Sequence, residues 1–206
     1  MCLALGCGKQ QSNNEAEMQA KARELAHKFI LVDTHIDVPY RLRRHFEDIS
    51  KATSEGNFDL PRARKGGLDA AFMSIYIPSS YQGTPRARAL ADSLIDMMET
   101  LVREHPDQFA LARSPEEVRA NFQAGKFSIA MGMENGAPIE TLEDVPYFYS
   151  RGIRYVTLTH AKDNHICDSS YDTTHTWNGL SPFGEKLVPA LNRAGIMVDI
   201  SHVSDS

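Results

Sequence analysis

Apolar runs that end in a histidine or a carboxylate constrain the fold of this chain more than any other feature. The first run, Phe29–Asp37, is aliphatic and β-branched in its first half, which is typical of a buried parallel strand. Residues two apart in a strand face the same side, so His35 and Asp37 should leave the strand end together. An imidazole and a carboxylate held in this way form half of a site for a divalent metal ion. Taken alone, such a pair is more often a core histidine followed by a helix N-cap.

The same pattern returns along the chain. Strands are expected near 67–77, 127–134, 153–160 and 196–202, and the last three end at Glu134, His160 and His202. Helices are expected near 15–28, 85–105, 141–150 and 181–194, with another opening at Ser114. Strands that alternate with helices form a parallel sheet with right-handed crossovers. The predicted fold class is therefore α/β, a (β/α)8 TIM-type barrel in a longer parent protein, with about five of the eight βα units present here.

Ligand-type side chains at the strand ends would meet if this sheet curls into a barrel, because the active sites of such barrels lie at the C-terminal strand ends. The residues concerned are His35, Asp37, Glu134, His160 and His202. One such residue at one strand end would be unremarkable, but four of the five expected strands end this way in a chain with only 8 histidines. This pattern favours a metal site. His165, Asp168, Asp172 and His175 lie in a polar loop that also contains Trp177, and this loop is interpreted as a solvated segment that shapes the pocket, not as a source of further metal ligands.

Composition excludes some other classes of function. The chain has 206 residues, a formal net charge of -5 at pH 7 and 42% hydrophobic residues, as in an ordinary globular domain. A mildly acidic chain lacks the basic face typical of nucleic-acid binding, so no nucleic-acid partner is expected. No apolar stretch of the sequence approaches the roughly 20 residues needed to span a bilayer.

The first 14 residues differ from the rest of the chain. Leu5-Gly6-Cys7-Gly8 resembles the end of a bacterial lipoprotein signal, in which the cysteine is lipidated, and a polar tether follows it. The segment lacks a basic start and its apolar part is short, so we interpret 1–14 as a truncated signal and tether ahead of a domain at 15–206. On this interpretation Cys7 carries the lipid, and the protein is exported to the periplasm or cell envelope and attached to the membrane. The alternative is an arbitrary start with two chance cysteines.

Five short motifs carry a more specific resemblance. They are Val32–Asp37, Gly132–Glu134, Arg154–His160, Gly179–Gly184 and Val198–Ser204. In this order and spacing they resemble the membrane (renal-type) dipeptidase family, which consists of zinc dipeptidases with an amidohydrolase-like barrel. The resemblance extends from about His27 to the last residue, and the motifs are specific in combination.

The resemblance implies a role for each strand-end residue. His35 and Asp37 would bind a first zinc ion, Glu134 would bridge two zinc ions, and His202 would bind the second. His160 would be a catalytic residue that faces the substrate and does not ligate metal. Two bridged zinc ions would supply a metal-bridging hydroxide that hydrolyses the amide bond of a dipeptide. Lys126 precedes its strand, so it would lie at the wrong end of the barrel to act as a carboxylated-lysine bridge.

The sequence also departs from the family pattern. A (β/α)8 barrel usually takes about 250 residues, whereas this chain has 206 and only five expected strands. A second histidine for the second zinc, a substrate-binding arginine and a proton-handling aspartate cannot be assigned. We therefore expect a fragment of an enzyme, inactive by itself. Two alternatives stay open: an amidohydrolase that acts on non-peptide amides such as β-lactams, and a half-barrel that binds metal or a partner without catalysis. A homodimer is also compatible with the sequence.

Overall fold

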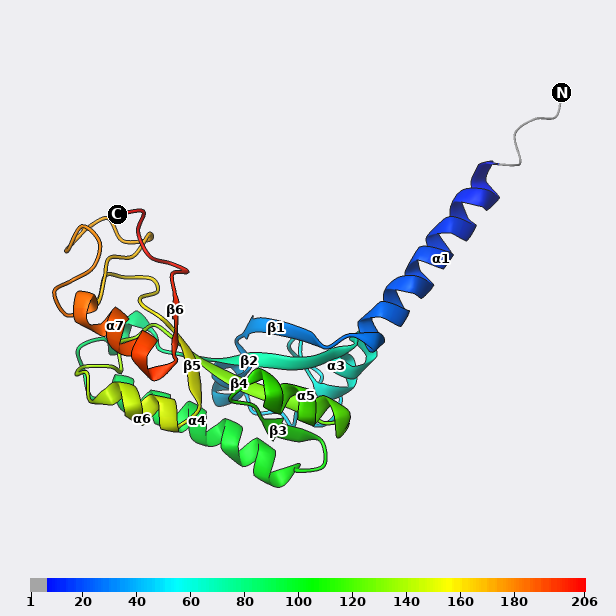
Figure 1. The fold of residues 1–206 in the computed structure, drawn as a ribbon, viewed down its shortest axis with the longest axis horizontal. Coiled ribbons are helices and arrows are strands. Elements are labelled where there is room, and N and C mark those ends of the chain that lie inside the picture. Colours follow the sequence, from blue (N-terminus) through cyan, green and yellow to red (C-terminus); the bar gives the residue numbers. More distant parts are fainter. Residues whose placement is uncertain (1–6) are drawn as a thin grey trace.

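The computed structural model describes the backbone of residues 7–206 and the side chains of residues 14–206. The predicted signal therefore lies largely outside the described residues. Cys7 begins the first helix, α1 (Cys7–Lys28), which starts earlier than the predicted position near Glu15 because no proline or glycine follows Gly8 in this segment. Figure 1 shows α1 projecting away from the rest of the chain. None of the described helices combines the length and the apolar character that crossing a membrane requires. Lipidation of Cys7 and export stay predictions.

After α1, strands and helices alternate as predicted. The strands are β1 (Leu31–Ile36), β2 (Leu68–Tyr76), β3 (Phe109–Leu111), β4 (Phe127–Glu134), β5 (Ile153–Thr157) and β6 (Met197–Asp199). The helices are α2 (Val38–Arg44), α3 (Leu60–Gly66), α4 (Arg86–Glu104), α5 (Pro115–Gln123), α6 (Asp144–Ser150) and α7 (Gly184–Ala194), with a 3-10 turn at Ser79–Tyr81. β3 and α3 were not predicted, because both are too short to show a clear hydrophobic period.

The strands form one parallel sheet in the order β1-β2-β4-β5-β6, with β3 paired to the first residues of β4. The sheet curls into a half-barrel, and α4, α6 and α7 lie along one side of it (Figure 1). All the carboxyl ends of the strands therefore point the same way. This arrangement confirms the predicted α/β fold class and places the strand-end residues at one edge of the sheet.

Successive side chains along the central strands point to opposite faces of the sheet, so that one face packs in the core and the other carries polar groups. Met73 and Ile75 of β2 are fully buried and belong to the same apolar cluster as Leu94 of α4. Ser74 lies between them on the opposite face, where its hydroxyl contacts the carboxylate of Glu134 from β4. The core thus holds the outer face of the sheet against the helices, and the inner face carries polar groups toward the strand ends.

β1 differs from the predicted buried strand. It pairs only with β2 and forms an edge of the sheet, so Leu31 is 39% exposed and Val32 is 46% exposed. Val32 also lines an apolar hollow of about 540 Å³ on the inner face, together with Phe72 and Met197. The sequence of β1 is that of a buried strand because its aliphatic residues suit the interior of a barrel. Among the described residues no strand covers β1 on its outer edge, so these side chains are partly exposed.

The loop that follows β5, residues 161–183, is solvated only in part: residues 170–178 are exposed except Asp172, whereas Asn164 and residues 166–169 are buried. Asp168 is fully buried and its carboxylate accepts hydrogen bonds from the backbone N–H groups of Trp177 and Gly179. The indole N–H of Trp177 donates to the carbonyl of Asn164 over 2.8 Å. Acidic side chains in this segment satisfy backbone donors, so the loop has a fixed shape without regular secondary structure.

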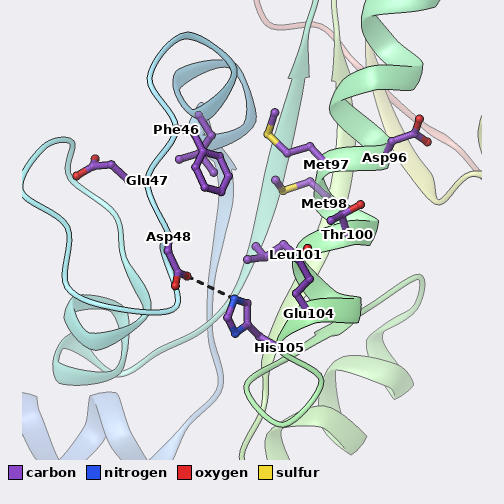
Figure 2. Close-up of a pocket in the computed structure, with 11 residues that line it drawn as sticks. Phe46, Glu47, Asp48, Asp96, Met97, Met98, Thr100, Leu101, Glu104 and His105 are labelled. Atoms are coloured by element: carbon purple, nitrogen blue, oxygen red, sulfur yellow. Dashed lines mark ion pairs between the residues drawn. The ribbon is translucent and has the colours of Figure 1, made fainter.

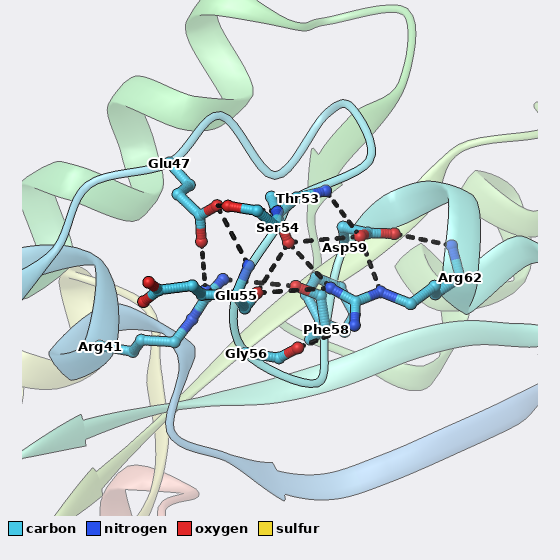
Figure 3. Close-up of polar contacts among 9 residues, drawn as sticks. All are labelled: Arg41, Glu47, Thr53, Ser54, Glu55, Gly56, Phe58, Asp59 and Arg62. Carbon is cyan, nitrogen blue, oxygen red and sulfur yellow. Dashed lines mark hydrogen bonds and ion pairs between the residues drawn. The ribbon is translucent and has the colours of Figure 1, made fainter.

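A second ordered loop, residues 45–59, joins α2 to α3 (Figure 3). Arg41 of α2 donates to the carboxylate of Glu47 at 2.7 Å and to a loop carbonyl. Asp59, only 1% exposed, accepts from the backbone N–H and the Nε of Arg62 at 2.8 and 2.7 Å. Two guanidinium groups therefore hold the loop. It forms one wall of a cavity of about 580 Å³ that also contacts Asp37.

Candidate metal centre

Glu134 is the centre of the strand-end cluster. It is the last residue of β4 and is 5% exposed. Its Oε1 lies 3.4 Å from the Nε2 of His160 and 3.4 Å from the Nε2 of His202. Its Oε2 lies 3.3 Å from the Nε2 of His35 and accepts a hydrogen bond from Ser74 over 2.9 Å. One carboxylate oxygen therefore faces two imidazoles, and the other faces a third.

His35 and Asp37 lie together at the end of β1. The Nε2 of His35 is 3.6 Å from Oδ1 of Asp37. Asp37 does occupy the N-cap position of α2, but its side chain makes no capping hydrogen bond. The N-cap alternative therefore fails for the side chain, which faces His35.

The five predicted residues form two groups that share one member. His35, Asp37 and Glu134 place one ligand atom each within 4.8 Å of one another, and so do Glu134, His160 and His202. β5 and β6 end at Thr157 and Asp199, so His160 and His202 come from the turns that follow and not from the strand ends themselves. The structure brings the predicted residues together, while the separate roles given to them stay predictions.

The charges in the cluster are strongly coupled. The nearby carboxylates of Asp37 and then Glu134 raise the pKa of His35 to about 10, and the contact with His35 lowers the pKa of Asp37. Burial lowers the pKa of His160. Carboxylates that hold a protonated imidazole in this way can hold another cation in place of the proton.

The residues present fit a metal ion by their chemistry. Three imidazoles and two carboxylates are the donor types that zinc binds, and Mn²⁺ or Co²⁺ would accept the same set. Most contacts within the cluster are 3.3 to 3.6 Å long, beyond the usual range of a direct hydrogen bond. Among the described residues, the Nδ1 of His160 is buried without a hydrogen-bond partner, which leaves this imidazole incompletely satisfied. A cavity of about 380 Å³ opens beside His35, Glu134 and His202.

Two residues of the site were missed by sequence reasoning. Ser74 supports the carboxylate of Glu134, and the hydroxyl of Tyr155 lies 2.7 Å from the Nδ1 of His35. The only sequence signal is a polar side chain at an inward-facing position of an otherwise apolar strand. That signal does not say which residue of another strand lies opposite.

A cavity of about 600 Å³ between the 45–51 segment and α4 does not have the features of a second centre (Figure 2). Three of the carboxylates that line it already have partners: Asp48 pairs with Lys51 and lies 3.4 Å from His105, Glu47 pairs with Arg41, and Asp96 pairs with Arg151. Lys51 and Ser50 lower the pKa of Asp48 to about 2, as expected for a satisfied carboxylate. The strand-end cluster is the better candidate because its donors converge on one carboxylate.

Comparison with known proteins extends this result. The sequence pattern of membrane dipeptidases (peptidase family M19) matches residues 19–206. The chain is 33% identical to Dipeptidase 3 of Mus musculus over 203 residues, which are 94% of this chain and 40% of that protein. The fold is similar to the probable dipeptidase PvdM from Pseudomonas aeruginosa, with a TM-score of 0.80 and 27% identity over 92% of this chain and 51% of that one. It also resembles dipeptidase AC, a metallo peptidase, with a TM-score of 0.74, 26% identity, and coverage of 86% of this chain and 57% of that one. The chain thus spans about half the length of the relatives that it matches.

Proposed function

Because the chain belongs to the membrane dipeptidase family, peptidase family M19, we propose that it carries the metal-binding part of a zinc-dependent dipeptidase. The observation that supports this proposal is the shared position of Glu134, whose two oxygens face two separate groups of ligand atoms. A carboxylate placed in this way suits two metal ions that lie close together.

Each residue then has a distinct task. His35 and Asp37 would hold the first zinc, His202 the second, and Glu134 both. When bound, the two zinc ions would supply an activated water near neutral pH and polarise the amide carbonyl. Ser74 would keep the carboxylate of Glu134 in its bridging orientation by donating to Oε2.

His160 is proposed to act on the substrate. The centroid of its ring lies 4.9 Å from that of Tyr76 and 4.4 Å from that of His202, so it is next to the second group of ligand atoms. A neutral or charged imidazole there could donate a hydrogen bond to the oxygen on which negative charge develops. Burial lowers the pKa of His160, which favours the neutral form in the metal-free protein.

The function is tested in two steps. Zinc binding is measured on the 206-residue chain by metal analysis after dialysis, and hydrolysis of dipeptides is measured on a protein that carries the whole family domain. We expect zinc to be retained and dipeptides to be cleaved. A β-lactam tested in the same assay distinguishes the alternative substrate class, since cleavage of that amide without any dipeptide turnover would contradict the proposal.

The different roles of His160 and His202 lead to a prediction. His160→Ala should leave the zinc content unchanged and lower kcat by about two to three orders of magnitude, the usual effect of losing one donor to a developing oxyanion. His202→Ala should lower the zinc content itself, because it removes a neutral ligand from the second group. Both variants are made in a protein that carries the whole family domain, and their zinc content and steady-state kinetics are measured. Loss of zinc in His160→Ala would show that this imidazole is a ligand.

A further inference from the structure

The two ring nitrogens of His35 have separate partners. Nε2 faces the carboxylates of Glu134 and Asp37, at 3.3 and 3.6 Å. Nδ1 lies on the other side of the ring, 2.7 Å from the hydroxyl of Tyr155. The contact with Tyr155 therefore does not involve Nε2, the nitrogen that faces the other proposed metal ligands.

Tyr155 is held tightly in the sheet. It is 7% exposed and its ring packs 5.3 Å from that of Phe72, measured between centroids. Gly132 is its partner on the neighbouring strand β4. A Cβ atom at Gly132 would come within 2.0 Å of the Tyr155 ring, so the ring can lie flat on β4 only because this position is glycine. The hydroxyl is thereby fixed in place.

We propose that Tyr155 is a positioning residue for His35: its hydroxyl oxygen accepts a hydrogen bond from Nδ1–H and so directs the Nε2 lone pair of His35 toward the metal. A histidine that ligates metal through one nitrogen normally donates its other N–H to a fixed acceptor, which sets both the tautomer and the orientation of the ring. Burial raises the pKa of Tyr155, so the phenol stays neutral. This inference rests on the proposed zinc site.

Tyr155→Phe tests the proposal, because it keeps the ring between Gly132 and Phe72 and removes only the hydroxyl. Zinc affinity of the 206-residue chain is measured by competition with a chromophoric chelator. We expect the zinc affinity of the group formed by His35, Asp37 and Glu134 to fall about 10- to 100-fold. Tyr147→Phe is the matched control: it also removes a phenol, one that donates to Asp92 between outer helices at 2.7 Å, and should leave zinc affinity unchanged.

A spectroscopic measurement separates positioning from general stability. In the zinc-loaded chain with ¹⁵N-labelled histidine, the Nδ1–H proton of His35 should be protected from solvent exchange, and in Tyr155→Phe it should exchange rapidly. Unchanged zinc affinity and an unchanged Nδ1–H signal in Tyr155→Phe would overturn the role of Tyr155. Absence of zinc binding by the unmodified chain would instead overturn the proposed metal site.

Discussion

Glu134→Gln is expected to remove zinc from both ligand groups at once. The amide keeps the size of the side chain but carries no negative charge and offers only one oxygen, so it cannot face His35 and His202 with equivalent ligand atoms. The loss of zinc affinity should exceed the 10- to 100-fold loss that is typical when a residue that only supports a ligand is replaced. Zinc content after dialysis and chelator competition on the 206-residue chain measure this. In a protein with the whole family domain, dipeptide hydrolysis should fall to background.

Glu140→Gln provides the control for this experiment. Glu140 is exposed and lies outside both ligand groups, so its variant should bind zinc like the unmodified chain. Circular dichroism of Glu134→Gln checks that the half-barrel is intact. If a folded Glu134→Gln chain keeps two equivalents of zinc through dialysis, Glu134 is not the bridge.

How well a strand could be predicted from the sequence depended on where it lies in the sheet. β4 is buried along its whole length, so its apolar run marks both of its ends, and it ends at Glu134 as predicted. β5 and β6 stop three residues before His160 and His202, because the backbone turns away while residues typical of strands, such as Leu158 and Ile200, continue. β1 has the composition of a buried strand but lies at an edge, and a sequence pattern does not report what covers a strand.

The candidate site was predictable to a similar degree. Parallel strands bring their carboxyl ends together whatever the register, so five residues could be placed in one cluster before the fold was known. The support of His35 by Tyr155 depends on the register that puts Gly132 beside that ring, and one sequence does not fix cross-strand register. The roles of His160 and His202 are also not separated by position, because both Nε2 atoms lie 3.4 Å from the same oxygen of Glu134.

The second large effect is expected on stability, at Asp59→Ala. Asp59 is the N-cap of α3 and is 1% exposed, and its carboxylate holds Arg62 and the backbone N–H of Thr53 (Figure 3). The substitution leaves these donors without their acceptor and unties the loop that borders Asp37. Loss of the cap and of a largely buried carboxylate should lower the free energy of unfolding by about 2–4 kcal/mol. The side chain of Arg62 is 43% exposed, so solvent weakens its ion pair with Asp59, and the expected loss lies toward the lower end of this range.

Chemical denaturation of Asp59→Ala and of the matched control Asp107→Ala measures this effect. Asp107 is exposed, so the free energy of unfolding of its variant should stay within about 0.5 kcal/mol of that of the unmodified chain.

The pH dependence of the stability gives an independent check. Burial opposes the charge of Asp59, but hydrogen bonds from Thr53 and Arg62 outweigh it and lower the pKa below 3.8. The stability from this carboxylate is therefore fully present above pH 3.8 and is lost as the pH falls through the lower pKa of the folded state. The difference between Asp59→Ala and the unmodified chain should shrink in acid, and a difference that is independent of pH would show that the carboxylate charge is not what holds the loop.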